Sequence, residues 1–289
     1  MSTDRELVIA LHCSGAGPGQ WRRLAERLGS RFELVAPEHY GGERTGPWTG
    51  AHAFSLADEA ERVLAIVDGT DRKVHLLGHS YGGGLALHIA LRRPARILSL
   101  SLYEPSAFHL LGQFGEIGAA AFAEIKAVAR NTGSCIVTGD YCGAATQFVN
   151  YWGGPQAWDA IKQPVQQALI GWAPKAPLDF RALIEEPTSV SAYARLRFPV
   201  LVVRGEHAPA PTRVIADMLP SLLPAPTRQV IAGAGHMGPL THPKPVNASI
   251  VAHIAAASTA TAEACDERTG SETVSRNKYA NGQTLAPHS

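Results

Sequence analysis

Apolar residues occur along this chain in two patterns, as short continuous runs and as longer segments in which they recur every three or four positions. Continuous runs of this length are typical of strands buried on both faces, and the periodic segments are typical of helices packed on them. The runs lie at residues 7–11, 32–36, 73–77, 97–103, 199–203 and 228–231, and the alternating periodic segments lie at 20–28, 56–67, 85–91, 212–219 and 243–257. This alternation predicts an α/β fold with a doubly wound, mostly parallel sheet of about six strands.

The alternation breaks after Pro105. Residues 107–195 contain no clear strand pattern longer than the run at 135–138, and they indicate helices at 118–129, 144–151, 155–169 and 178–185. Helices inserted into such a sheet suggest a cap over its carboxyl edge, where ligands bind in open α/β sheets. Aromatic residues in this segment would line or brace an apolar pocket, although each alone is more typical of a helical core; they are Phe148, Tyr151, Trp152, Trp158 and Trp172.

These patterns predict four parts of the chain. They are a first part of the α/β core at residues 1–106, a helical cap at 107–195, a second part of the core at 196–257, and a flexible polar tail at 258–289. The tail is predicted from small and polar residues that follow one another without periodicity.

Composition and charge narrow the class of protein. Of the 289 residues 45% are hydrophobic, enough for a substantial core, and 26 basic against 25 acidic side chains leave almost no net charge. We therefore expect a small-molecule substrate, no nucleic acid or membrane as partner, and a monomer or a homodimer. The N-terminus lacks the pattern of a signal peptide, and no apolar run approaches the roughly 18 residues of a membrane span.

The cysteines are scattered along the chain, at Cys13, Cys135, Cys142 and Cys265. They form no Cys-x-x-Cys pair and no mixed Cys/His spacing typical of a metal site. This distribution favours a cytoplasmic protein with free thiols and no bound metal.

The sequence Gly-His-Ser-Tyr-Gly at residues 78–82 follows a predicted strand and opens a predicted helix. The outer glycines suit a point where strand and helix approach so closely that a Cβ atom would clash. A serine on such a strained turn projects its hydroxyl above the sheet, so Ser80 is a candidate nucleophile. The motif alone also occurs in ordinary glycine-rich turns, but the strand–turn–helix context favours the nucleophile.

Five landmarks follow one another along residues 7–256: the loop at His12, the turn at Ser80, the helical insertion, the strand and loop at 200–205, and the loop at 233–236 before the last helix. In this order they make the chain resemble the α/β-hydrolase superfamily. Two antiparallel strands that often precede the first loop in that family are missing. The insertion is similar to the cap of lid-bearing esterases and lactonase-like members.

The resemblance implies a serine, acid and histidine triad. His236 is expected to be the base, and His242, at a helix start, is its nearest rival. The usual position of the family's aspartate holds Ala208, which cannot accept the imidazole N–H. Glu104 is the first candidate for the acid, because some haloalkane dehalogenases carry their acid at that strand end. Glu206 is the second candidate, and the absence of any acid is the third possibility.

The resemblance also implies an oxyanion hole made of two backbone N–H groups. Tyr81, directly after the nucleophile, would supply one of them. The loop at His12 would supply the other, from Ser14 by position, with Cys13 as the alternative. We expect His12 to hold the shape of this loop and the Ser14 hydroxyl to brace it.

Together these residues predict a serine hydrolase that cleaves carboxylic esters, or lactones, of a small apolar substrate through an acyl-enzyme on Ser80. No metal or organic cofactor is expected. A peptidase, a C–C bond hydrolase, or a cofactor-free perhydrolase or oxygenase would use the same parts. The missing aspartate at position 208 leaves open a second class, a catalytically weak ligand-binding protein on this fold. Serine at position 80 argues against dehalogenase and epoxide hydrolase chemistry, which runs through aspartate in this superfamily.

Overall fold

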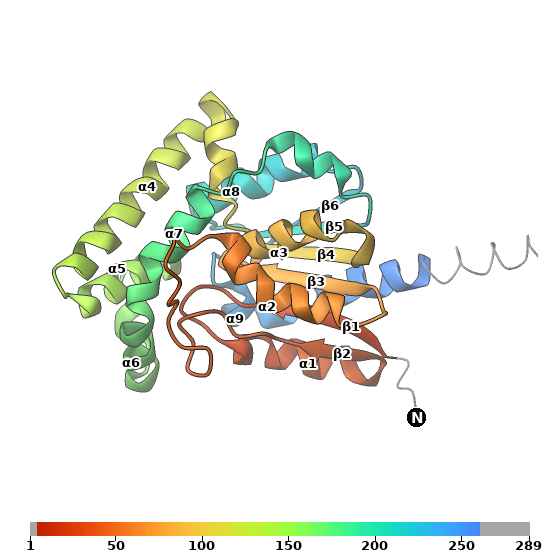
Figure 1. Ribbon diagram of the computed structural model, residues 1–289, viewed down its shortest axis with the longest axis horizontal. Helices are drawn as coiled ribbons and strands as arrows, with labels where there is room; N and C mark the ends of the chain where they lie inside the picture. The colour runs from red at the N-terminus through yellow and green to blue at the C-terminus, as the bar shows by residue number, and fades with distance from the viewer. Residues whose placement is uncertain (1–4, 261–289) are drawn as a thin grey trace, which may run out of the picture.

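A six-stranded sheet lies at the centre of the molecule in a computed structural model that describes residues 5–260 (Figure 1). Its strands are β1 (Glu6–Leu11), β2 (Phe32–Val35), β3 (Val74–His79), β4 (Ile97–Tyr103), β5 (Val200–Gly205) and β6 (Pro226–Ile231). They lie in the order β2-β1-β3-β4-β5-β6, and all neighbours are parallel. The predicted α/β class and doubly wound sheet are therefore confirmed.

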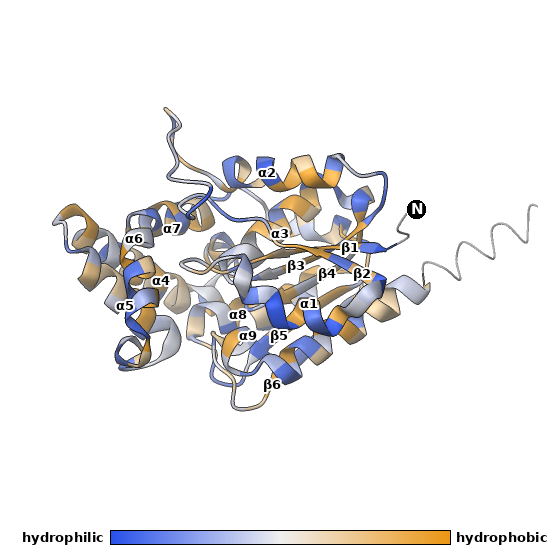
Figure 2. Cartoon of the chain, turned by 90° about the horizontal axis from the view of Figure 1, so that it is seen from below, coloured by the Kyte–Doolittle hydropathy of each residue, from blue (hydrophilic) through white to orange (hydrophobic). Residues whose placement is uncertain are grey.

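Helices cover both faces of this sheet. Outside the insertion they are α1 (Arg22–Leu28), α2 (Leu56–Asp68), α3 (Tyr81–Arg92), α8 (Ala210–Met218), a short α9 (Gly238–Thr241), and a last helix at residues 243–260. Leu7, Ile9 and Leu11 of β1 share a buried cluster with α2, α3 and α8, whereas Val8 and Ala10 pack with α1 and the last helix. Figure 2 shows the apolar strands enclosed between these helices. The strand thus buries both faces, as its continuous apolar run predicts.

A side-chain cap determines where α2 begins. The Ser55 hydroxyl accepts a hydrogen bond from the Asp58 N–H at 3.4 Å, and the Asp58 carboxylate accepts one from the Ser55 N–H at 2.9 Å. This reciprocal pair satisfies N–H groups that a first helical turn leaves free. The same turn carries Glu59, which is buried.

The insertion between β4 and β5 is helical. It contains α4 (Glu116–Val137), α5 (Tyr141–Gly153), α6 (Gln163–Trp172) and α7 (Ala176–Ile184). Helices α4, α5 and α6 stand beside the sheet, on the left in Figure 1. The helix predicted at residues 155–169 is instead a 3₁₀ turn at Ala157–Ala160 followed by α6, because Pro164 suits the first turn of a new helix. The division into a separate cap and core stays a prediction.

The last helix extends further than the sequence predicts. It continues to residue 260, and the buried Ser258 hydroxyl bonds the Ile254 carbonyl at 3.0 Å and also the Glu6 carboxylate. The predicted end of the core at residue 257 therefore comes too early. The rest of the predicted tail, residues 261–289, lies outside the described residues.

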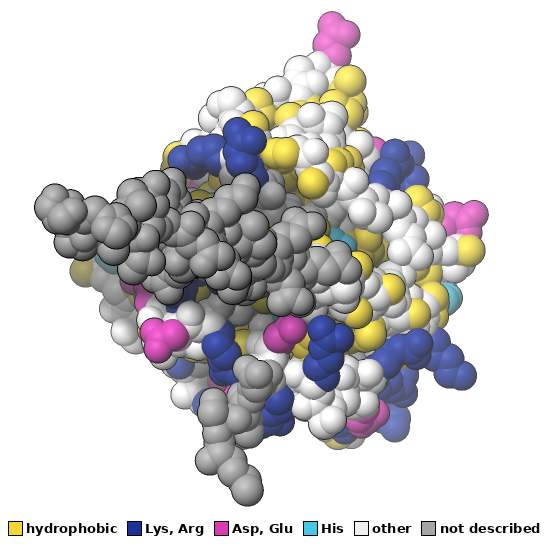
Figure 3. Space-filling model, turned by 90° about the vertical axis from the view of Figure 1, so that its right-hand side faces the viewer, with side chains coloured by type: hydrophobic (Ala, Val, Ile, Leu, Met, Phe, Trp, Pro, Cys, Tyr) yellow, Lys and Arg dark blue, Asp and Glu magenta, His cyan; other side chains and the backbone are white. Residues whose placement is uncertain are grey.

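Two features are absent from residues 5–260. No helix of this part is long and apolar enough to cross a membrane, and no cluster of histidine, cysteine and acidic side chains in it could hold a metal ion. Cys13, Cys135 and Cys142 are free thiols. On the face shown in Figure 3, opposite the insertion, basic and acidic side chains are interspersed.

Candidate active site

A sharp turn joins β3 to α3 and carries Ser80. Its backbone has φ 55° and ψ −118°, outside the regions that most residues adopt. A Cβ atom added at Gly78 would lie 2.2 Å from the carbonyl oxygen of Gly82, and one added at Gly82 would lie 2.4 Å from that of Leu11. Only glycine fits these two positions, so strand and helix can approach and hold the strained serine between them.

Ser80, His236 and Glu104 form one hydrogen-bonded chain. The Oγ atom of Ser80 lies 2.9 Å from Nε2 of His236, and Nδ1 of His236 lies 2.7 Å from Oε2 of Glu104. All three side chains are buried. They come from the turn after β3, the loop after β6 and the end of β4, so the parallel sheet brings them together at its carboxyl edge. The structure thus joins the three residues in the order that general-base activation of a serine requires.

The sheet itself holds Glu104 in place. Its φ of 42° is unusual for a residue with a side chain, and its N–H donates to the Val203 carbonyl at 2.9 Å. The carboxylate accepts hydrogen bonds from the N–H of Gly205 at 2.9 Å and from the hydroxyl of Thr212 at 2.8 Å. These donors satisfy the buried carboxylate while Oε2 faces the imidazole. A carboxylate directly after β4 therefore contacts the imidazole, in a chain that has Ala208 at the usual position of the family's aspartate.

The two rival residues lie away from this chain. The side chain of Glu206 is 56% exposed and accepts a hydrogen bond from the N–H of Gly233 at 2.8 Å. The Nδ1 atom of His242 lies 2.9 Å from the hydroxyl of its neighbour Thr241. Among residues 5–260 neither rival has a hydrogen bond to His236.

Two backbone N–H groups beside Ser80 have no acceptor within residues 5–260, those of Tyr81 and Ser14. The N–H of Cys13, by contrast, donates to Oε1 of Gln20 at 3.1 Å. Of the two expected donors in this loop, only the Ser14 N–H is therefore without an acceptor in this part of the chain. Burial also raises the pKa of the Cys13 thiol to about 12, so this side chain stays uncharged at neutral pH.

Buried histidines brace the loops on either side. His12 donates from Nδ1 to the Cys13 carbonyl at 2.8 Å, as expected for a residue that holds the loop's shape. His79, which the sequence reading passed over, donates from Nε2 to the His236 carbonyl at 2.9 Å, so its Nδ1 accepts from Gln20 at 3.1 Å. Burial, with the charge that His236 can carry, holds the pKa of His79 well below its usual value. This neutral side chain links the loop of His236 to Gln20, and Gln20 in turn accepts the hydrogen bond from Cys13 in the loop of Ser14.

A second buried polar cluster lies against the Ser14 loop, and we call it the ion cluster. Its centre is Lys175, whose Nζ lies 3.0 Å from Oε2 of Glu59 and 2.5 Å from Oδ1 of Asp179. The Ser14 hydroxyl donates to Oδ2 of Asp179 at 2.6 Å, and the Tyr81 hydroxyl donates to Oε2 of Glu59 at 2.8 Å. The cluster thereby ties α7 of the insertion to α2, to α3 and to the loop that carries Ser14.

Burial and the neighbouring charges have opposite effects on the pKa values of Lys175 and Asp179. Burial lowers the pKa of Lys175, but Asp179 and Glu59 outweigh it, and the net pKa is above its usual value. Burial raises the pKa of Asp179, against the opposing effect of Lys175. The adjacent His39 has its pKa lowered to about 3 by burial and by the charge of Lys175. The positive charge of this cluster therefore resides on the lysine.

Two cavities of very different size reach Ser80. The larger has a volume of about 340 Å³, is mainly apolar, and is lined by His236 and by residues of the insertion that include Phe148, Trp152 and Leu169. The smaller has a volume of about 10 Å³, and its lining includes Ser106, Asp179, Phe180 and Leu183. The rings of Trp152 and His236 lie with centroids 4.2 Å apart. Two of the five predicted aromatic residues, Phe148 and Trp152, thus line the site, whereas Trp158 packs within the insertion.

The chain belongs to the α/β hydrolase family, because the model of that family matches it over residues 8–249. A putative carbamate hydrolase, RutD of Pantoea ananatis, is 30% identical over 102 residues, which are 34% of this chain and 36% of that protein. Lipase LipV of Mycobacterium tuberculosis is 33% identical over 100 residues, which are 34% of this chain and 37% of LipV. These matches span about a third of the length of the curated relatives.

Solved structures agree with this assignment of the fold. The enol-lactonase from Burkholderia xenovorans LB400 superposes with a TM-score of 0.66 at 15% identity, over 87% of this chain and 92% of that one. At this identity the likeness shows the fold alone. The family and the curated relatives together support a hydrolase.

Proposed function

We propose that the protein is a serine hydrolase that cleaves carboxylic esters through an acyl-enzyme on Ser80. One observation carries the proposal: the buried chain from Oγ of Ser80 through His236 to Glu104, beside two N–H groups without acceptors in residues 5–260. A serine hydroxyl is a weak nucleophile until a base removes its proton, and an ester carbonyl needs donors for its developing charge. This site supplies both requirements.

The geometry supports the following sequence of steps. Nε2 of His236 takes the proton of Ser80 while Oγ bonds to the ester carbon, and Glu104 holds Nδ1–H and stabilises the imidazolium. The N–H groups of Tyr81 and Ser14 bind the oxyanion. The imidazolium then gives its proton to the departing alcohol. A water molecule next gives a proton to His236 and attacks the acyl carbon. The bond from that carbon to Oγ then breaks, the imidazolium returns the proton to Oγ, and the acid leaves.

The unequal cavities at Ser80 indicate which part of the ester is large. The leaving oxygen receives its proton from His236, so the leaving group belongs in the larger cavity, which His236 lines. The acyl group then points toward the smaller cavity of about 10 Å³, with room for about one water-sized group. We therefore expect acyl groups the size of acetyl or carbamoyl on apolar alcohols. Similarity to a putative carbamate hydrolase supports a small acyl group.

The test of the reaction is labelling with a fluorophosphonate, combined with hydrolysis of p-nitrophenyl acetate. Wild type should be labelled on Ser80 and turn over the ester, and Ser80→Ala should lose both. Wild type that binds the ester without labelling or turnover would favour the ligand-binding alternative.

A chain-length series tests the assignment of the cavities. Wild type should prefer p-nitrophenyl acetate to the octanoate, and Leu183→Ala should shift the preference toward longer acyl chains because it enlarges the smaller cavity. Leu169→Ala, in the larger cavity, is the matched control and should change the preferred alcohol instead. A shift in acyl preference that is equal in both variants would contradict the assignment.

Further properties stay predictions beside this proposal. We propose a small-molecule substrate, catalysis without a cofactor, a monomer or homodimer, and a cytoplasmic location. A panel of esters, lactones and amides, run with and without peroxide, separates ester hydrolysis from the other reactions that this set of residues can support.

A further inference from the structure

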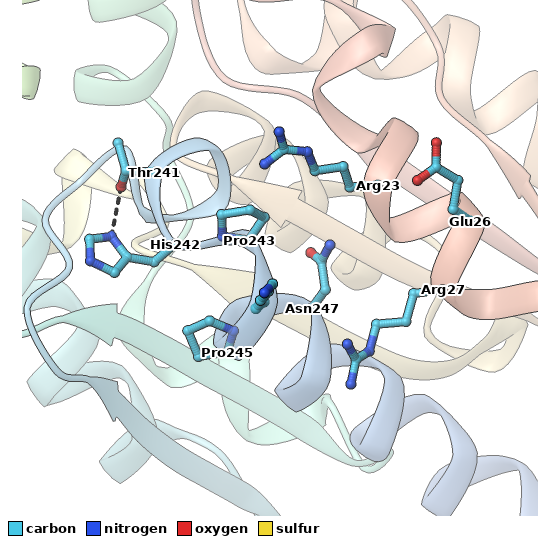
Figure 4. A pocket seen from close by; sticks show the side chains of 9 residues that line it. Arg23, Glu26, Arg27, Thr241, His242, Pro243, Pro245 and Asn247 are labelled. Atoms are coloured by element: carbon cyan, nitrogen blue, oxygen red, sulfur yellow. Dashed lines mark hydrogen bonds between the residues drawn. The ribbon is translucent and has the colours of Figure 1, made fainter.

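A separate cavity lies between α1 and the start of the last helix, and Figure 4 shows it from close by. Its volume is about 710 Å³, and its walls are α1 on one side and residues 241–247 on the other. Thr241 lines this cavity and also the larger cavity at Ser80. The two cavities therefore adjoin at that residue.

Three cationic side chains line this cavity without a counterion. Arg23 and Arg27 lie one turn apart on α1, and Lys244 lies on the facing helix. None of the three has an ion pair or a side-chain hydrogen bond with any residue between 5 and 260. Glu26 also lines the cavity, but its carboxylate is turned away from Asn247 in Figure 4. We call this space the basic cavity.

Asn247 is the independent observation that points to a ligand. Its side chain is only 5% exposed, yet within the described chain its amide has no hydrogen-bond partner. In Figure 4 this amide lies between the side chains of Arg23 and Arg27. Because Asn247 lines the cavity, an acceptor bound there can take the hydrogen bond that this amide does not make within the described chain.

We propose that the basic cavity binds a phosphate group, with its oxygens on Arg23 and Arg27 and a further hydrogen bond from the Asn247 amide. Guanidinium groups present paired N–H donors that match phosphate oxygens. The backbone of the last helix adds little, because Pro243 and Pro245 lack N–H groups in its first turn. The helix terminus is therefore not the basis of the site.

The phosphate has two possible sources. It belongs either to a separate phosphorylated compound or to the leaving group of the ester, which would reach the basic cavity past Thr241. The second source rests on the proposed function, whereas binding of phosphate in the cavity does not.

Calorimetry with inorganic pyrophosphate on the full-length protein, at one fixed low salt concentration, tests the site. Wild type and Ser80→Ala should bind equally, and the double variant Arg23→Gln/Arg27→Gln should bind at least tenfold more weakly. Arg22→Gln is the matched control, because this exposed neighbour on α1 lies outside the cavity. Absence of binding, or equal weakening by the control, would overturn the proposal.

Asn247→Leu separates a ligand contact from a structural role. The variant should weaken pyrophosphate binding while the melting temperature stays the same or rises, because the lost amide has no partner in the described chain. Unchanged binding would remove Asn247 from the site, and with it the argument for a built site.

Kinetics with two aryl acetates, one with and one without a phosphate on the ring, distinguish the sources. If the phosphate is part of the substrate, kcat/KM of the phosphorylated ester falls at least tenfold in the double variant and that of the uncharged ester does not change. If it is part of a separate compound, the variant hydrolyses both esters as wild type does. In either case the pyrophosphate measurement stands independently of Ser80.

Discussion

Glu104 on one side, and Glu59 with Asp179 on the other, are buried carboxylates near Ser80 that have different kinds of partner. Glu104 receives hydrogen bonds from a backbone N–H and a hydroxyl, and it faces the imidazole of His236. Glu59 and Asp179 instead share the ammonium group of Lys175. The first carboxylate has a partner whose charge changes in the proposed reaction, whereas the second pair has a partner whose charge is constant.

The difference also concerns which parts of the chain are joined. Glu104 and its partners come from β4, β5, α8 and the loop after β6, all of them outside the insertion. The ion cluster joins α7 of the insertion to α2 and to the Ser14 loop. We infer that the first group serves the proton transfer and that the second holds the insertion against the oxyanion loop. Four predictions test this separation, in order of decreasing effect.

Replacement of the Glu104 carboxylate should have the largest effect on turnover. Glu104→Gln is isosteric but no longer favours the imidazole tautomer with its proton on Nδ1, so kcat should fall by about 10⁴-fold. Steady-state hydrolysis of p-nitrophenyl acetate measures this. Glu206→Gln is the matched control, because its side chain is 56% exposed and accepts a hydrogen bond from the N–H of Gly233, in the loop after β6, without a hydrogen bond to His236. A large loss in the control with a small one in Glu104→Gln would reverse the assignment.

Removal of the cation from the ion cluster should lower stability more than it changes chemistry. Lys175→Met leaves two buried carboxylates without their partner, and the free energy of unfolding should fall by about 3–5 kcal/mol. Urea unfolding measures this change. Arg181→Met, on α7, which begins directly after Lys175, breaks the exposed pair with Glu185 and should cost about 0.5 kcal/mol or less. Equal effects of the two variants would show that the cluster does not hold the insertion.

Acid should destabilise the protein through its buried histidines. His12, His39 and His79 have folded-state pKa values below the usual one, chiefly because of burial, so the unfolded chain binds more protons at acid pH. Their contribution to the free energy of unfolding is fully present above about pH 6.5. It is lost as the pH falls below that value, by about 1.4 kcal/mol for each histidine per pH unit. Urea unfolding at pH 7.5 and at pH 5.5 measures this loss. His39→Gln should reduce the dependence of the unfolding free energy on pH, and the exposed His207→Gln should leave it unchanged. Equal stability of the wild type at both pH values would contradict the prediction.

The smallest effect is expected at Ser14, whose hydroxyl contacts the ion cluster and which lines the same cavity as Ser80. Ser14→Ala removes the hydroxyl that donates to Asp179 but keeps the backbone N–H, so kcat should fall by about threefold to tenfold, the equivalent of one ordinary hydrogen bond. A loss of a thousandfold would mean that the hydroxyl itself contacts the reacting oxygen, and the two groups would no longer be separate.

The site residues that the sequence predicts are those that lie at or just after the carboxyl end of a strand. The runs of apolar residues locate β3, β4 and β6, and parallel strands bring their carboxyl ends to one edge. Ser80, Glu104 and His236 follow those three strands, so their meeting could be expected from the order of elements. Ala208 left the acid open among Glu104, Glu206 and no acid at all, and resemblance to some haloalkane dehalogenases favoured Glu104.

The ion cluster could not be predicted in this way. Lys175 and Glu59 are separated by 116 positions and lie on helices whose periodicity shows a buried face but not the neighbour across it. A buried lysine is also rare, so composition favours an exposed one. The sequence did indicate a structural role for His79, because a bulky polar residue at the end of a buried strand needs hydrogen-bond partners inside the protein. The helix predicted at 155–169 failed because hydrophobic periodicity continued across Pro164.

The indole of Trp152 lies over the imidazole of His236, with ring centroids 4.2 Å apart and planes 32° apart. An aromatic face attracts a cation, so the indole would stabilise the imidazolium that forms in the proposed reaction. Trp152 belongs to α5, which makes the insertion sensitive to that charge. We therefore expect the emission of this tryptophan, one of five in the chain, to change when His236 gains a proton in the proposed reaction.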